Sequence, residues 1–114
     1  MASATRTTPA PACRSTSPPV PLRQAARAFF AGSYGETLEI LGEAQLAAPR
    51  ELATARLLSA AARFSLFVAG GREDTELERQ ALADIGACRA LDPRVVPDPL
   101  LFSPPFVELF RQQR

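Results

Sequence analysis

Residues 51–93 constrain the fold more than any other stretch, because they contain two apolar helical patterns joined by a short polar turn. In the first pattern, apolar side chains recur at helical spacing from Leu57 to Val68 over a wide surface. Such a surface is typical of a helix that is covered on two sides. The second pattern places four residues on one face: Leu77, Ala81, Ile85 and Cys88. This stretch therefore predicts an antiparallel helical hairpin.

Local signals mark the ends of both helices in this hairpin. Gly70-Gly71 can end the first helix in a left-handed conformation. Thr75 with Glu78 fits a capping box at the start of the second helix, and Asp74 is an alternative cap. The second helix is expected to stop before Pro93, because proline cannot continue a helix and restrains the residue before it.

A second hairpin is expected before residue 51. Its first helix is predicted over 22–31 and its second over 36–47, with a turn between them that contains two glycines. Pro49 is expected to close the unit. Three acids line one edge of the second helix: Glu36, Glu39 and Glu43.

The chain after residue 93 reads as an extended connector followed by a short helix. Pro97 and Pro99 disfavour helix, whereas Ser103 followed by two prolines is a good helix start. The fold class that follows is all-α: two antiparallel helical hairpins and a short C-terminal helix. A domain is predicted over 22–114, in which 94–114 forms a capping segment.

Residues 1–21 hold five prolines, seven serines or threonines, two arginines and no acid. This composition predicts a disordered tail. Two other interpretations stay open. The start could be misplaced, in which case Ala10 to Cys13 would be the remnant of an export signal, or the segment could be an organellar transit peptide.

Composition excludes much enzymology. The chain has no His, and all 13 of its cationic side chains are arginines. Without imidazole or lysine there is no Ser-His or Cys-His pair, no Schiff base and no phosphate-loop lysine. Two cysteines, Cys13 and Cys88, cannot form a metal site without other soft ligands. We therefore expect no catalytic residues, no cofactor and no metal.

Nucleic-acid binding and membrane insertion are not predicted either. The four arginines of residues 1–35 are dispersed and lack interleaved aromatic residues. The longest uncharged run, 99–107, has nine residues and is broken by proline. Arg56 and Arg63 argue against a membrane span for the helix that carries them, because each costs about 3 kcal/mol near a bilayer centre.

The run from Ala25 to Pro49 resembles a tetratricopeptide repeat. Gly32 and Tyr34 match the family's turn, and the large, small and proline positions of its second helix follow at Leu41, Ala44 and Pro49. Thr37 stands where the family prefers Ala, and the early Trp and Gly of the family are missing. Residues 51–93 are similar but longer by about five residues in the turn. The resemblance implies a right-handed superhelix over 22–93.

The pattern of residues 22–110 also resembles uncharacterised bacterial proteins with a helical-repeat core and a Phe-Ser-Pro-x-Phe ending, a family that implies no activity. The repeat family binds peptides on the face formed by its first helices. By the resemblance, the matching positions include four aromatic residues: Phe29, Phe30, Phe64 and Phe67. The alternative is that these side chains form the core. Arg56 and Arg63 are further candidates, as ligands of a partner's carboxylate; the alternatives are that they pair with the acidic edge or are simply solvated.

Two repeats cannot cover their own apolar faces. We therefore expect five apolar residues of the C-terminal segment to pack onto the repeats or to contact a second copy or a partner: Leu100, Leu101, Phe102, Phe106 and Phe110. The function expected is a non-catalytic protein–protein interaction scaffold that binds a protein or peptide. The alternative is a structural, envelope-associated helical protein with a misplaced start. The sequence as given predicts a cytoplasmic protein, and a misplaced start predicts an exported one.

Overall fold

The computed structural model describes residues 18–113, which form five α-helices and no strand. The chain is therefore all-α over this range, as the periodicity predicts. The helices are α2 (Val20–Phe30), α3 (Tyr34–Glu43), α4 (Pro49–Ala69), α5 (Thr75–Leu91) and α6 (Pro104–Gln112).

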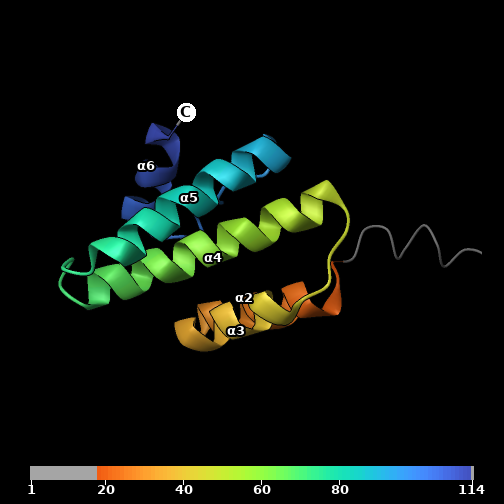
Figure 1. The fold of residues 1–114 in the computed structure, drawn as a ribbon, viewed down its shortest axis with the longest axis horizontal. Helices are drawn as coiled ribbons and strands as arrows, with labels where there is room; N and C mark the ends of the chain where they lie inside the picture. Colours follow the sequence, from red (N-terminus) through yellow and green to blue (C-terminus); the bar gives the residue numbers. More distant parts are fainter. Residues whose placement is uncertain (1–17, 114) are drawn as a thin grey trace, which may run out of the picture.

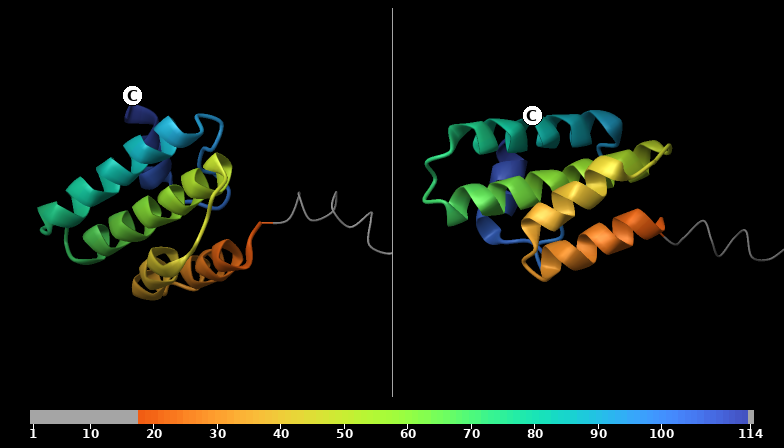
Figure 2. Two further views of the ribbon diagram at one scale, coloured as in Figure 1. Left: turned by 45° about the vertical axis from the view of Figure 1, so that its right-hand side comes forward. Right: turned by 60° about the horizontal axis from the view of Figure 1, so that its bottom comes forward.

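Helices α4 and α5 form the long antiparallel hairpin that the sequence predicts, and the other elements are arranged around it (Figure 1). The α2–α3 hairpin lies along the edge of α4 that is remote from α5. The two further views show α6 crossing behind α4 and α5 at a steep angle (Figure 2). The connector between α5 and α6 runs behind α4 and brings the C-terminal segment to the first hairpin.

Helices α2 and α3 each begin two residues before the predicted start, so α2 starts at Val20, inside the segment 1–21 that is expected to be a tail. The largest difference is at the junction of α3 and α4. Pro49 begins α4 instead of closing the preceding unit, and α3 ends at Glu43, four residues before the predicted end. Ala44 and Ala48 are both extended, so residues 44–48 form a linker. Proline is well suited to the first turn of a helix, because the missing N–H is not needed there and its φ is already helical.

The turn between α4 and α5 is built by Gly71, Arg72 and Asp74. Gly71 has φ +82°, the left-handed value that glycine adopts without strain, and Arg72 follows at φ +62°. The Asp74 carboxylate then accepts hydrogen bonds from the backbone N–H groups of Glu76 and Leu77. Asp74 is therefore the cap of α5, and the capping box headed by Thr75 is not the one used.

One hydrophobic core contains residues from both hairpins and from the C-terminal segment. Phe106 and Phe110 are fully buried in it, and Phe102 is half-buried against it. The aromatic ring of Phe102 contacts Phe29, with ring centroids 5.5 Å apart. The C-terminal phenylalanines thus cover the two hairpins within the same chain. Leu100 and Leu101 are exposed, so they do not pack inward, and the alternative that they contact a second copy or a partner stays a prediction.

Arg89 fixes the end of α6 against α5. Its guanidinium lies 4.4 Å from the ring centroid of Phe110 and donates a hydrogen bond to the Phe110 backbone carbonyl. A cation over an aromatic face and a charged donor at a helix C-terminus are both favourable. This contact explains why a nine-residue helix holds a defined orientation.

In the described range, α4 is the one helix that is long and apolar enough to cross a membrane by length and composition. In the fold it is the central helix, with eight buried residues and with α2, α3 and α5 packed against it. This is the environment of a core helix.

Candidate functional site

The six residues predicted as partner ligands do not form one surface. Phe29, Phe64 and Phe67 are buried, which agrees with the alternative that they belong to the core. Phe30 is different, because its side chain is 51% exposed at the end of α2. Of the aromatic positions implied by the repeat resemblance, Phe30 therefore remains accessible to a partner.

Arg56 and Arg63 both bind the carboxylate of Asp84, which extends from α5. Arg56 Nη1 lies 2.9 Å from Asp84 Oδ1, and Arg63 Nη1 lies 2.6 Å from Asp84 Oδ2. Asp84 is 1% exposed, whereas Arg56 is 53% and Arg63 29% exposed. The arginines therefore pair across the hairpin with a buried acid, and the expected pairing with the acidic edge of α3 is wrong.

These arginines lie on the opposite side of α4 from Ser65, which is near the exposed Phe30. Arg56 and Ser65 are nine residues apart, which is about two and a half helical turns. Ser65 lines a hollow together with Phe30, so the arginine pair faces away from that hollow.

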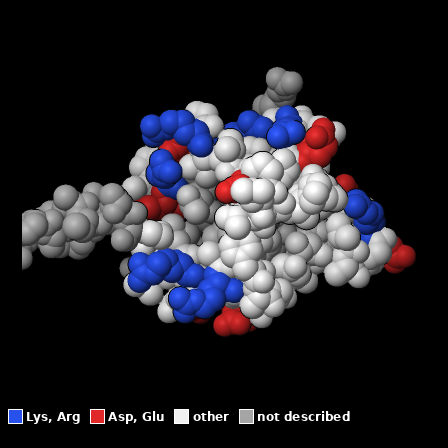
Figure 3. Space-filling view, turned by 180° about the vertical axis from the view of Figure 1, so that it is seen from behind, with Lys and Arg blue, Asp and Glu red and all other residues white. Residues whose placement is uncertain are grey.

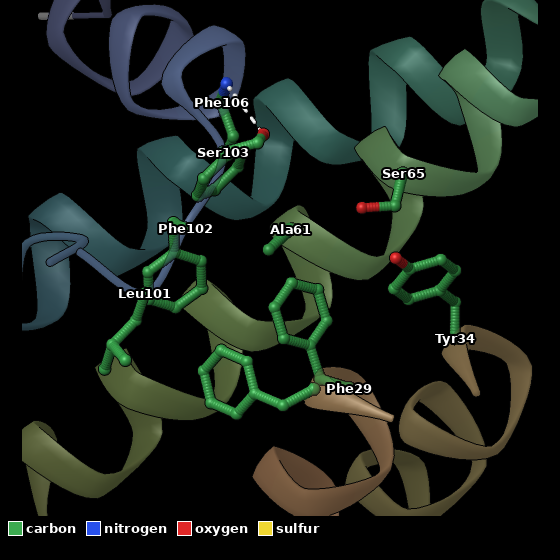
Figure 4. Close-up of a pocket in the computed structure, with 9 residues that line it drawn as sticks. Phe29, Tyr34, Ala61, Ser65, Leu101, Phe102, Ser103 and Phe106 are labelled. Carbon is green, nitrogen blue, oxygen red and sulfur yellow. Dashed lines mark hydrogen bonds between the residues drawn. The ribbon is translucent and has the colours of Figure 1, made fainter. Parts of the chain in front are cut away.

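The hollow beside Phe30 has a volume of about 180 Å³ and lies between α2, α4 and the connector (Figure 4). Its wall is mainly aromatic, because the rings of Phe29, Phe30 and Phe102 lie within 6 Å of one another. Phe106 and Ala61 form its floor, and the exposed Leu101 stands at its edge (Figure 4). No charged residue of the described range lines it.

A second hollow of about 330 Å³ continues from the first along α4. The two share Tyr34, Ser65 and Ser103, so together they form one groove, which we call the α4 groove. Phe64, Val68 and Pro105 make most of the second hollow apolar.

Arg72 is the one charged side chain in the described range that lines the α4 groove. Its guanidinium lies 5.7 Å from the ring centroid of Phe64 and 5.9 Å from that of Phe67. Within residues 18–113, no carboxylate lies within 4.0 Å of it. The groove is therefore apolar along its length and positive at one end.

Three hydroxyl groups mark the junction between the two hollows. Figure 4 shows the hydroxyls of Tyr34 and Ser65 directed toward the same space. Ser103 Oγ accepts a hydrogen bond from the Phe106 backbone N–H, at 3.4 Å, and so caps α6. These groups are neutral donors and acceptors within reach of an occupant of the groove.

The sequence carried a signal for some of this groove. Tyr34 matches the turn of the repeat resemblance, Phe30 is one of the partner-binding positions that the resemblance implies, and Leu101 belongs to the apolar C-terminal segment. The role of Ser65 could not be found from spacing, because a serine in an apolar helix is ordinary. From behind, the molecule shows a broad area with few charged side chains, bordered by arginines (Figure 3).

Cys88 lies in the core and is not a candidate nucleophile. Burial raises the pKa of its thiol to about 11, and its Sγ lies 3.7 Å from the Val95 carbonyl oxygen. A rise from the ordinary range lowers the thiolate fraction about 100-fold at neutral pH.

We therefore expect Cys88 to react with iodoacetamide about 100-fold more slowly in the folded protein than in urea-unfolded protein. The measurement uses a Cys13→Ser variant, so that one thiol is followed by mass spectrometry. Equal rates in the two states would contradict the burial of Cys88.

Within the described residues, no group of three or more Cys, Asp or Glu side chains is placed to hold a metal ion. Asp92 is engaged locally: hydrogen bonds from the Arg94 side chain and backbone hold the pKa of its carboxyl below the usual value. No family model, curated protein or solved structure matches the chain.

Proposed function

We propose that this protein is a non-catalytic interaction module that binds another protein chain through the α4 groove. The resemblance of the two hairpins to tetratricopeptide repeats supports the proposal, since that family binds peptides on the face formed by the first helix of each repeat. In this chain the first helices are α2 and α4, and the groove lies between them and the C-terminal segment.

The observation that carries the proposal is an exposed apolar rim around a preformed hollow. Phe30 and Leu101 are both more than half exposed and both line the first hollow. Isolated exposed apolar side chains are ordinary, but neighbouring ones that line a hollow are typical of interaction sites. Aromatic side chains in such a position supply much of the binding energy of an interface.

Much of the face expected to bind a peptide is occupied by the chain itself. Phe102 and Phe106 contact Phe29 and Phe64, so these positions are satisfied internally. A partner is therefore expected to bind along the open groove without entering the core.

The test compares proteins captured by the wild-type chain with those captured by Phe30→Asp. We expect a protein bound by the wild type to bind the variant more weakly by about tenfold or more, because a carboxylate placed at the rim must be desolvated. The readout is quantitative mass spectrometry, followed by a titration with the purified captured protein.

Val20→Asp is the matched control. Val20 lies on the same helix, is 50% exposed and lines neither hollow, so it tests a new charge at equal exposure. If both variants lose the same protein, or neither loses any, the groove is not the binding site.

A further inference from the structure

We infer that the partner of the α4 groove is a second copy of this chain, which inserts Leu100 of its connector. This inference rests on the proposed function and names the occupant. It predicts a symmetric homodimer in which each chain supplies one groove and one connector.

The connector presents an apolar side chain that the fold leaves uncovered. Leu100 is 91% exposed, the highest value among the large exposed apolar residues of the described range. Its neighbour Leu101 forms an edge of the groove. Val96, on the same connector, is also exposed. The exposed Leu100 therefore lies next to the groove of its own chain, through its neighbour Leu101.

The connector is held in shape by a turn at Asp98. Asp98 Oδ1 accepts a hydrogen bond from the Leu100 backbone N–H, at 2.9 Å. The Asp98 carbonyl oxygen accepts from the N–H groups of Leu101 and Phe102. Leu100 is thus presented on an ordered turn, which lowers the entropy lost on binding.

Charge favours the connector over residues 1–17 as the occupant of the groove. The groove is apolar with Arg72 at its end, so it fits an apolar residue accompanied by an acid. Asp98-Pro99-Leu100 has that composition. Residues 1–17 contain two arginines and no acid, so they would bring like charge to Arg72.

Symmetry makes the arrangement reciprocal. In a two-fold interface the same patch meets itself, so residue pairs occur twice. The proposed dimer has its two-fold axis beside residues 100–101, with each Leu100 over the other chain's first hollow and each Asp98 on the side of the other chain's Arg72. Leu101 borders the first hollow and Arg72 the second, so separate experiments test the Leu100 contact and the Asp98 contact.

The first experiment measures the mass of the full chain by sedimentation equilibrium over a range of concentrations. We expect a species of twice the 12.2 kDa chain mass. Leu100→Asp is expected to raise the dimer Kd by about 100-fold or more, since the anchor becomes charged. Its circular dichroism and melting temperature should match the wild-type monomer, because Leu100 makes little contact within the chain. Val20→Asp should leave the Kd unchanged.

The second experiment exchanges the charges of the proposed pair. Arg72→Asp and Asp98→Arg should each weaken the dimer about tenfold at low salt, and the double variant should recover most of the affinity. Aspartate tolerates the left-handed backbone at position 72. Asp98→Asn keeps an acceptor for the turn and loses the charge, so it separates a turn defect from a charge effect.

A wild-type chain that stays monomeric up to its solubility limit overturns the inference. A dimer that survives Leu100→Asp, or a double variant no tighter than the singles, also overturns it. A monomer that still captures another protein in a Phe30-dependent manner overturns the inference and leaves the proposed function standing. A dimer dissociated by Leu100→Asp but not by Phe30→Asp shows that the dimer does not use the groove, which overturns the inference, and the capture experiment with Phe30→Asp then decides the proposed function separately.

Discussion

Phe106→Ala is expected to destabilise the fold by about 3–5 kcal/mol, which is a large part of the stability of a domain this size. Phe106 is fully buried, and its ring centroid lies 6.0 Å from that of Phe64 and 5.7 Å from that of Phe102. Truncation leaves a cavity between α4 and the C-terminal segment. Urea unfolding followed by circular dichroism at 222 nm measures the loss.

Leu101→Ala is the matched control for this experiment. Leu101 belongs to the same C-terminal segment but is 57% exposed, so its removal from the monomer should cost no more than about 0.5 kcal/mol. Equal losses for the two variants would mean that the C-terminal segment does not pack on the two hairpins as described.

Asp84→Asn is expected to destabilise the fold by about 2–3 kcal/mol. The change preserves shape but removes the charge that two arginines bind. It also replaces one of the two carboxylate oxygens with an amide nitrogen, which donates and cannot accept a hydrogen bond from an arginine. The cost stays below that of breaking a fully buried pair, because Arg56 and Arg63 can regain water. Denaturant unfolding at neutral pH measures it.

The two arginines are expected to differ in how much each contributes to stability. Arg63 is the less exposed of the two, so Arg63→Gln should cost more than Arg56→Gln, which we expect to cost no more than about 1 kcal/mol. Glu76→Gln, which removes the exposed pair with Arg79, should have little effect. An Asp84→Asn loss as small as that of Glu76→Gln would show that the buried acid contributes nothing to stability.

The hairpin of α4 and α5 could be predicted from sequence because its signals are local and redundant. Helical periodicity, Gly70-Gly71 and the Asp-Pro stop all point to the same boundaries. The linker at 44–48 could be predicted only at its end, where Ala48 precedes Pro49 and is therefore extended. The early end of α3 carries no local signal, since the alanines that follow it favour helix. The sequence predicts that Pro49 closes the first hairpin, because proline stops a helix, but proline is equally suited to the first turn of the next helix.

The pairing of Arg56 and Arg63 needed contacts between helices far apart in sequence. Spacing places both arginines on one strip of α4, but it does not say which acid faces them. A usable signal did exist, since Asp84 is the one acid between Ala81 and Ile85 on the apolar face of α5. A lone acid on the apolar face of one helix, together with two cations on the neighbouring helix, is a sequence pattern that predicts a buried ion pair between them.

The contact of Phe102 with Phe29 has a consequence for how the chain unfolds. Linear repeat arrays join only sequence neighbours, so their units can melt successively from an end. Here an aromatic contact joins residues 73 positions apart and ties the first hairpin to the last segment. Such a closure raises the contact order, which slows folding relative to a simple helical bundle. It also couples the first hairpin to the C-terminal segment, so heat should melt the domain in one cooperative transition.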